Sequence, residues 1–350
     1  MNIKSRTLPY GPIPYDNVSA AAKMMAKLFE QMPYLPLMPN IDANDSLLKR
    51  TLSGIPGMVF DGDGAVTFMP SIKGYKENLV KLEKAFNKAV EKHLDAYAFE
   101  SVFLEKYFAL IKKFRSANAC INLLGPFTLS QLLKNADGTQ LLLEKSYRKL
   151  FIQSICVKAL WLTKKIRAIN PDIVPILILE EPLAGIFGNV KRENQDITAD
   201  LVVHIYERIV ERLHSENILV AVQSKEKCDW TIPIRAGVDL ISFDAYNNPN
   251  NLCIIPEAIT EFIERGGMIN WGIVPVMTES MVKSLNIEYV TDRLKATIAG
   301  LVLAGVSEKD IYKSAMVSIQ GDVSKLPLIF AEKAIMLSTQ LAGRITSLRF

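Results

Sequence analysis

Short apolar runs alternate with longer amphipathic segments in the last two thirds of the chain. Apolar runs bounded by turn residues predict buried strands, whereas apolar positions that recur with the helical period predict helices. We therefore expect strands at residues 119–124, 176–180, 218–223, 238–243, 268–274 and 314–319. Helices are expected between most of them, near 141–168, 196–215, 256–266, 290–305 and 326–343.

The N-terminal third is less regular. Strands are expected near Arg6 and near Leu35, where prolines forbid a helix. Helices are predicted near 18–31 and 45–52, followed by a β-hairpin over 58–68 with an Asp-Gly turn and by helical periodicity over 75–116.

The total of about eight strands with intervening helices favours an α/β fold, the (β/α)8 TIM barrel. We expect one barrel domain over residues 1–350, with an insertion at about 55–116 that adds the hairpin and extra helices. The alternative is an open doubly wound sheet. That fold usually carries a glycine-rich phosphate turn after its first strand, and the sequence has no such turn.

Polar residues follow several of the expected strands. Because active sites of barrels lie at the carboxyl ends of the strands, Glu180 and Glu181 are candidates for acid/base chemistry. The alternative is that one or both cap the next helix or pair with a surface lysine. Other strand ends supply Gly11, Gln223, Lys225, Asp244, Asn270, Trp271 and Gln320. This mixture suits a small polar ligand such as an amino acid, although the amides could equally bond loop backbone.

Composition excludes several classes of function. The net charge is only +4 and the basic residues form no stripe with aromatics, so no nucleic-acid partner is expected. The longest apolar run is too short to span a bilayer and the first residues lack a signal-peptide core, which predicts a cytoplasmic protein without a membrane partner. None of the three histidines falls at a strand end, so a Ser-His or Cys-His nucleophile is not expected. His204 and Glu207 are interpreted as a solvated helical pair.

A set of short motifs, taken in order, resembles the cobalamin-independent methionine synthase family, within the grouping shared with uroporphyrinogen decarboxylase. The motifs are Gly11 to Tyr15, Pro33 to Pro39, Gly125 to Thr128, Glu180 to Pro182, Cys228-Asp229-Trp230, Phe243 to Tyr246, and Gly267 to Pro275. Each is weak alone, but together they cover nearly the whole chain. The resemblance implies the barrel fold, methyl-transfer ancestry, and a ligand pocket that includes Asp229 and Trp230.

The resemblance also implies a zinc site that this chain has lost. Relatives bind zinc through a His-x-Cys pair, an acidic residue and a Cys-Gly pair. Here these positions read Gln223-Ser224-Lys225, Asp244 and Gln320-Gly321. Only the carboxylate is kept, which makes a poor zinc site, so no cofactor and no metal are expected. Cys228 and Cys253 with a carboxylate would be an alternative zinc site, although their spacing carries no metal motif.

Lys225 stands where the resemblance places the zinc charge. We hypothesise that its ammonium lies close to Asp244, with Glu181 as a further candidate neighbour, and keeps these buried carboxylates ionised without metal. The alternative is a lysine that extends to solvent.

Three functions remain open from the sequence. One is a methyltransferase-related enzyme that acts on an amino-acid-like ligand, with Glu181, Asp244 and Lys225 as its catalytic groups. The second is a non-catalytic ligand-binding or regulatory barrel. The third, with less support, is a subunit of a corrinoid methyltransferase system, since the resemblance makes a corrinoid protein a candidate partner.

Overall fold

The chain builds one parallel six-stranded sheet whose strands follow one another in sequence order. The computed structural model describes residues 3, 5–9, 11–133, 140–186 and 197–347. The strands are β3 (Asn118–Leu124), β4 (Val174–Glu180), β5 (Leu219–Ser224), β6 (Leu240–Phe243), β7 (Met268–Val274) and β8 (Ala315–Ile319). They are buried on both faces, as expected for strands that read as continuous apolar runs. All six strands expected from the C-terminal pattern are confirmed.

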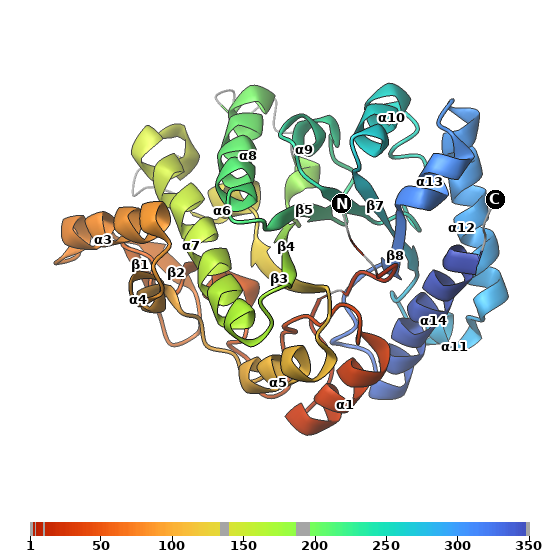
Figure 1. Ribbon diagram of the computed structural model, residues 1–350, viewed down its shortest axis with the longest axis horizontal. Coiled ribbons are helices and arrows are strands. Elements are labelled where there is room, and N and C mark those ends of the chain that lie inside the picture. The colour runs from red at the N-terminus through yellow and green to blue at the C-terminus, as the bar shows by residue number, and fades with distance from the viewer. Residues whose placement is uncertain (1–2, 4, 10, 134–139, 187–196, 348–350) are drawn as a thin grey trace.

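Helices follow the strands and cover the convex face of the curled sheet (Figure 1). They are α6 (Pro126–Leu132), α7 (Lys145–Ile169), α8 (Ala199–His214), α9 (Thr231–Arg235), α10 (Pro256–Glu264), α11 (Glu279–Ser284), α12 (Ile287–Leu303), α13 (Glu308–Ser314) and α14 (Leu328–Ser347), with short 3-10 turns at Leu141–Leu143 and Ala184–Ile186. Thr198, Thr278 and Asn286 cap α8, α11 and α12 through their side-chain oxygens. Among the described helices, none is long and apolar enough to cross a membrane.

The N-terminal third adds elements beside this sheet. They are α1 (Val18–Leu28), α2 (Leu47–Leu52), β1 (Met58–Phe60), β2 (Val66–Phe68), α3 (Tyr75–Lys88), α4 (Glu91–Leu94), a 3-10 turn (Asp95–Tyr97) and α5 (Leu104–Phe114). β1 and β2 form the expected antiparallel hairpin. The helical stretch over 75–116 is three helices, because Ala89 has a φ of 46° and ends α3. α3 and the hairpin extend from the left side in Figure 1.

In the described residues, the segments near Arg6 and Leu35 do not form the two strands that were expected there. Each segment instead makes one isolated parallel bridge, Thr7 with Val317 of β8 and Tyr34 with Cys120 of β3. The two segments meet where the Ile13 amide donates to the Leu37 carbonyl at 3.0 Å. Proline is the reason, since it removes the N–H that a ladder needs and the segments carry one every few residues. The sheet is thus a curled half-barrel whose two edges are covered by extended chain.

Candidate functional site

A row of polar side chains crosses the concave face of the sheet. Glu180 pairs in register with Gln223, Gln223 with Ser242, and Ser242 with Asn270. Paired residues of parallel strands point to the same face, so these four side chains lie in one layer. The Asn270 amide nitrogen donates to Ser242 Oγ and to Ser318 Oγ of β8, each at 2.8 Å. The layer therefore extends over five neighbouring strands.

Glu180 is the carboxylate of this polar layer. It is partly buried at the end of β4, where Asn122 Nδ2 of β3 donates to its Oε1 at 2.8 Å. Burial raises the pKa of the Glu180 carboxyl, and the Asn122 hydrogen bond and the charges of Lys225 and Arg50 partly offset this rise. The charge of Lys225 thus favours the ionised form of the Glu180 carboxylate. The hypothesis named Asp244 and Glu181, and for these two carboxylates the role of Lys225 stays a prediction.

Three amide oxygens of the layer lack a partner. Asn122 Oδ1, Gln223 Oε1 and Asn270 Oδ1 are buried and accept no hydrogen bond from any described residue. A buried acceptor without a donor is costly, and such groups in folded proteins are usually met by ordered water or a ligand. We therefore expect a ligand or ordered water next to Glu180 to donate hydrogen bonds to these three oxygens.

A second polar layer lies two residues further along the strands. Asp244 follows β6 and is 4% exposed. Its Oδ2 accepts from Gln320 Nε2 at 2.8 Å and from Asn247 Nδ2 at 2.7 Å, while its Oδ1 accepts from the Asn247 amide at 2.9 Å. These donors already occupy both carboxylate oxygens. Asp244 therefore orders the side chains around it and does not offer an open carboxylate to a ligand.

A cleft of about 530 Å³ opens beside the second layer, where Gln320 lines it, and we call it the mouth cleft. It lies at the carboxyl ends of β5, β7 and β8, where barrel enzymes bind ligands. Its polar walls are Lys225, Thr278, Glu279, Gln320, Asp322 and Lys325. Lys225 lies beside Gly321, where an added Cβ would come within 4.0 Å of its Nζ. The structure thus places Glu180, Gln223, Lys225, Asp244, Asn270 and Gln320 at one end of the sheet, and their role in ligand binding stays a prediction.

Glu181 lies on the opposite face of the sheet from Glu180. It is 1% exposed and accepts from the Phe127 amide at 3.0 Å and the Thr128 amide at 2.7 Å, at the start of α6. The Tyr206 hydroxyl of α8 also donates to it. Burial raises the pKa of Glu181, and these hydrogen bonds oppose the rise. Glu181 thus caps a helix, but this helix precedes β4, whereas the alternative named the helix that follows the strand. An acid/base role for Glu181 stays a prediction.

The remaining predicted ligand-binding residues lie away from the polar layers. Trp230 and Trp271 are buried and pack edge-on against Phe243, whose side chain points outward from β6. Asp229 accepts from the amide and hydroxyl of Thr231 at the start of α9. Gly11 contributes a turn with a φ of 62°, a conformation that favours glycine.

Sequence reasoning missed several members of the site. Asn122, Ser242 and Ser318 belong to the polar layers but stand inside apolar runs that were interpreted only as strands. A polar residue near the end of a buried strand was the available signal, because burial of such a group requires a partner. Arg50, which contributes charge at Glu180, lies on a helix far away in sequence and carried no signal.

The donor set around Asp244 does not fit zinc. Its neighbours Gln320 and Asn247 present amide N–H groups to the carboxylate, and Lys225 is a cation. Cys228 lies on the outer side with Glu181 and Tyr206, whereas Cys253 packs near Gly300 of α12. Within the described ranges, no group of three or more His, Cys, Asp or Glu side chains could hold a metal ion. His204 and Glu207 are exposed and 3.8 Å apart, as their solvated interpretation predicts.

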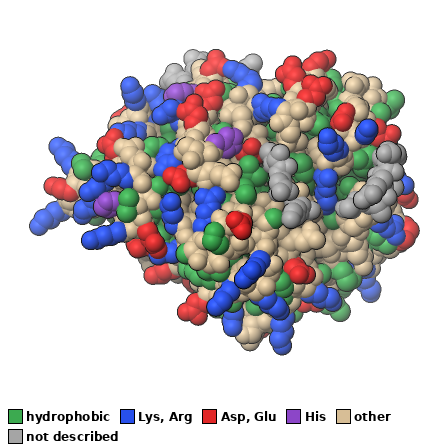
Figure 2. Space-filling view, viewed as in Figure 1, with side chains coloured by type: hydrophobic (Ala, Val, Ile, Leu, Met, Phe, Trp, Pro, Cys, Tyr) green, Lys and Arg blue, Asp and Glu red, His purple; other side chains and the backbone are tan. Residues whose placement is uncertain are grey.

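On the face shown in Figure 2, basic and acidic side chains are interspersed.

Comparisons with protein-family models and with curated proteins found no match. Among solved structures, a methyltransferase from Methanosarcina mazei is similar over 97% of this chain and 94% of its own, with 12% identity and a TM-score of 0.47. Likeness at this level does not place the chain in a family.

Proposed function

We propose that the chain is a metal-free relative of the cobalamin-independent methionine synthases whose mouth cleft binds a small amino-acid-like molecule. The two bridged segments at residues 7 and 34 then stand for the first two strands of a (β/α)8 barrel. The methionine synthase relationship rests on the ordered motifs of the sequence. The ligand class rests on the polar layer that carries Glu180 and three unpartnered amide oxygens below the lysines of the cleft.

The ligand is oriented by charge. An ammonium group supplies the donors that Glu180 and the amide oxygens of Asn122 and Gln223 lack. A carboxylate at the other end of the ligand meets Lys225 and Lys325 at the cleft opening. Hydrogen bonds to charged groups contribute about 1.5–3 kcal/mol each, enough to select a zwitterion over a neutral molecule.

The non-catalytic alternative is favoured over an enzyme by one observation. Of the three carboxylates predicted at strand ends, Glu181 and Asp244 are already engaged by protein donors, which leaves Glu180 as the partly open one. Binding of the amino-acid-like ligand is therefore the function that we assign, with a methyl-transfer origin and a corrinoid-protein partner as part of the same proposal.

Ligand titration of the purified protein tests the assignment. Calorimetry with a panel of L-amino acids, including methionine and homocysteine, should reveal at least one ligand of the cleft. Glu180→Gln and Lys225→Met should each weaken its binding by roughly 10- to 100-fold, since each removes one charged hydrogen bond. Lys227→Met is the matched control, because Lys227 is exposed in the same loop. Equal affinity of the Lys225 and Lys227 variants would refute the proposed orientation.

The affinity should also depend on pH. Burial places the pKa of Glu180 above the ordinary carboxyl value, and only the ionised form pairs with an ammonium. Binding should therefore strengthen as the pH rises through that pKa and then level off. In Glu180→Gln this rise should disappear, and its persistence would show that another group receives the ligand.

Elemental analysis tests the metal-free part of the proposal. Protein purified without added metal or chelator should contain far less than one zinc per chain, because amide donors already occupy the Asp244 carboxylate. One zinc per chain would restore thiolate alkylation as the leading chemistry.

A further inference from the structure

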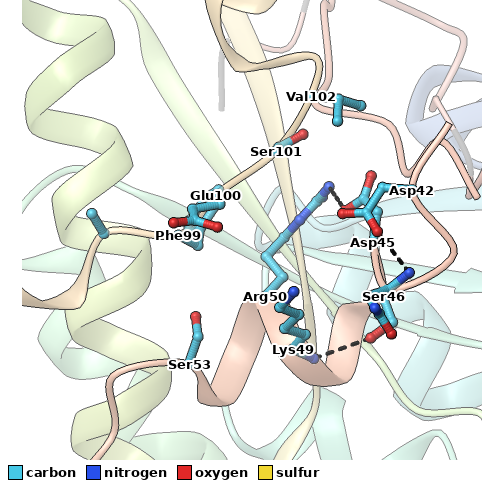
Figure 3. Close-up of a pocket in the computed structure, with 12 residues that line it drawn as sticks. Asp42, Asp45, Ser46, Lys49, Arg50, Ser53, Phe99, Glu100, Ser101 and Val102 are labelled. Atoms are coloured by element: carbon cyan, nitrogen blue, oxygen red, sulfur yellow. Dashed lines mark hydrogen bonds and ion pairs between the residues drawn. The ribbon is translucent and has the colours of Figure 1, made fainter. Parts of the chain in front are cut away.

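A second cavity lies to one side of the sheet, and we call it the side cavity. It measures about 460 Å³ and opens between the turn at Asp42–Ser46, one face of α2, and the segment Ala98–Val102 (Figure 3). None of the residues that line it lines the mouth cleft. It is therefore separate from the proposed amino-acid site.

Arg50 forms the inner wall of the side cavity. Its guanidinium donates to the Leu35 carbonyl at 2.8 Å and the Pro36 carbonyl at 3.0 Å, and it lies 3.6 Å from the Asp45 carboxylate. Figure 3 shows Arg50 leaving α2 with Phe99 and Glu100 on one side and Asp45 on the other. The Arg50 charge is thus neutralised by Asp45 and held by backbone.

A second buried cation stands directly behind the cavity wall. Lys158 of α7 is fully buried, and its Nζ donates to Ser53 Oγ at 3.2 Å and to the Ser53 carbonyl. Burial alone lowers the pKa of Lys158 to about 7, with no carboxylate contributing. Ser53 lines the cavity, and its hydroxyl hydrogen stays available because its oxygen accepts from the ammonium. This wall therefore favours a negatively charged group.

The remaining lining residues divide by charge. Lys49 lies one helical turn before Ser53, so both occupy the same face of α2. The facing segment and turn supply the carboxylates of Glu100 and Asp42, and Asp42 receives the Asn44 amide on one oxygen only. Cationic and hydroxyl donors thus face carboxylate acceptors across one small space.

We infer that the side cavity binds a small zwitterion, with its carboxylate at Lys49 and Ser53 and its ammonium at Glu100 and Asp42. Lys158 supports this carboxylate through the Ser53 hydroxyl. A carboxylate placed there stabilises the protonated lysine, so binding near neutral pH takes up a proton. Proton uptake is the signature that separates this site, with its buried Lys158, from the mouth cleft, where Lys225 is partly exposed and Lys325 is exposed.

Calorimetry at about pH 7.5 in two buffers of different ionisation enthalpy measures this uptake. The probes are β-alanine and 4-aminobutyrate, with acetate and methylamine as single-charge controls. At least one zwitterion should bind more than roughly tenfold tighter than either control, with a proton taken up. Lys158→Met should abolish the uptake, and Ser53→Ala and Lys49→Met should weaken binding by about tenfold or more. Lys164→Met, in the same helix but partly exposed, should leave both unchanged.

Three results would overturn the inference. The first is that no zwitterionic probe binds at a concentration of about 10 mM. The binding free energy would then be smaller in magnitude than roughly 3 kcal/mol. The second is binding without proton uptake or without loss in Lys158→Met. The third is binding that Lys225→Met removes and Lys49→Met does not, which would place the probe in the mouth cleft instead.

Discussion

Replacing Glu181 with alanine should lower the free energy of unfolding by roughly 3 kcal/mol or more. The change leaves two buried amides of α6 and the Tyr206 hydroxyl without their acceptor. Each unsatisfied buried donor costs about 1–3 kcal/mol, while the relief from burying a charge offsets part of the total. Chemical denaturation of the two proteins measures the difference.

Glu180→Gln is the matched comparison, because the Glu180 carboxylate accepts from one described side chain, Asn122, and its replacement should cost far less stability. Gly125 gives an independent test of the same contact. A Cβ at this position would lie 2.1 Å from Glu181 Oε1, so Gly125→Ala should be strongly destabilising. In the Glu181→Ala background that penalty should largely disappear, since the clashing oxygens are gone. Additive losses would show that Gly125 is required for another reason.

Lys158→Met should make the protein more stable at neutral and acidic pH. The folded state lowers the pKa of Lys158 from 10.5 to about 7. Between these two pH values the unfolded chain binds one more proton than the folded protein. The free energy of unfolding of the wild type therefore increases as the pH rises from 7 to 10.5, and the destabilisation by the buried lysine is complete below pH 7. A shift of this size corresponds to roughly 4–5 kcal/mol, reduced in the variant by the lost hydrogen bonds to Ser53.

Urea denaturation from pH 6 to pH 10 should therefore show the largest advantage of Lys158→Met at the acidic end. The advantage should shrink steadily toward alkaline pH, where the wild-type lysine is neutral in both states. Lys164→Met reports the effect of removing a partly exposed lysine from the same helix. A difference that does not change with pH would mean that Lys158 keeps its charge through a partner outside the described contacts.

The strand ends of the site could be predicted from sequence, but the direction of each side chain could not. β4 is apolar on both faces, so its pattern does not reveal whether Glu180 or Glu181 points inward. Only the register with β3 and β5 decides this. The fold, too, could be predicted only in part. The apolar runs predict the six later strands, whereas the prolines near residues 9 and 36 reduce two expected strands to single bridges.

The side cavity lay beyond sequence reasoning for a different reason. Lys158 reads as one polar position in a long helix, and Ser53 as a helix end more than a hundred residues earlier. Their contact depends on how α2 and α7 pack, which local patterns do not specify. A lysine on the apolar side of a helical repeat is nonetheless a usable signal, since an unpaired buried ammonium is rare.

The short segment at residues 5–8 has a protective consequence. Leu8 donates to the Val317 carbonyl at 3.0 Å, Val317 donates to the Arg6 carbonyl at 2.8 Å, and the Arg6 side chain bonds two further carbonyls beside β8. Without these few residues, β8 would present a free edge of unpaired backbone groups, which is a template for strand addition from another molecule. Residues 5–8 therefore cover the β8 edge, and we expect terminal tags or truncations that displace them to promote self-association through that edge.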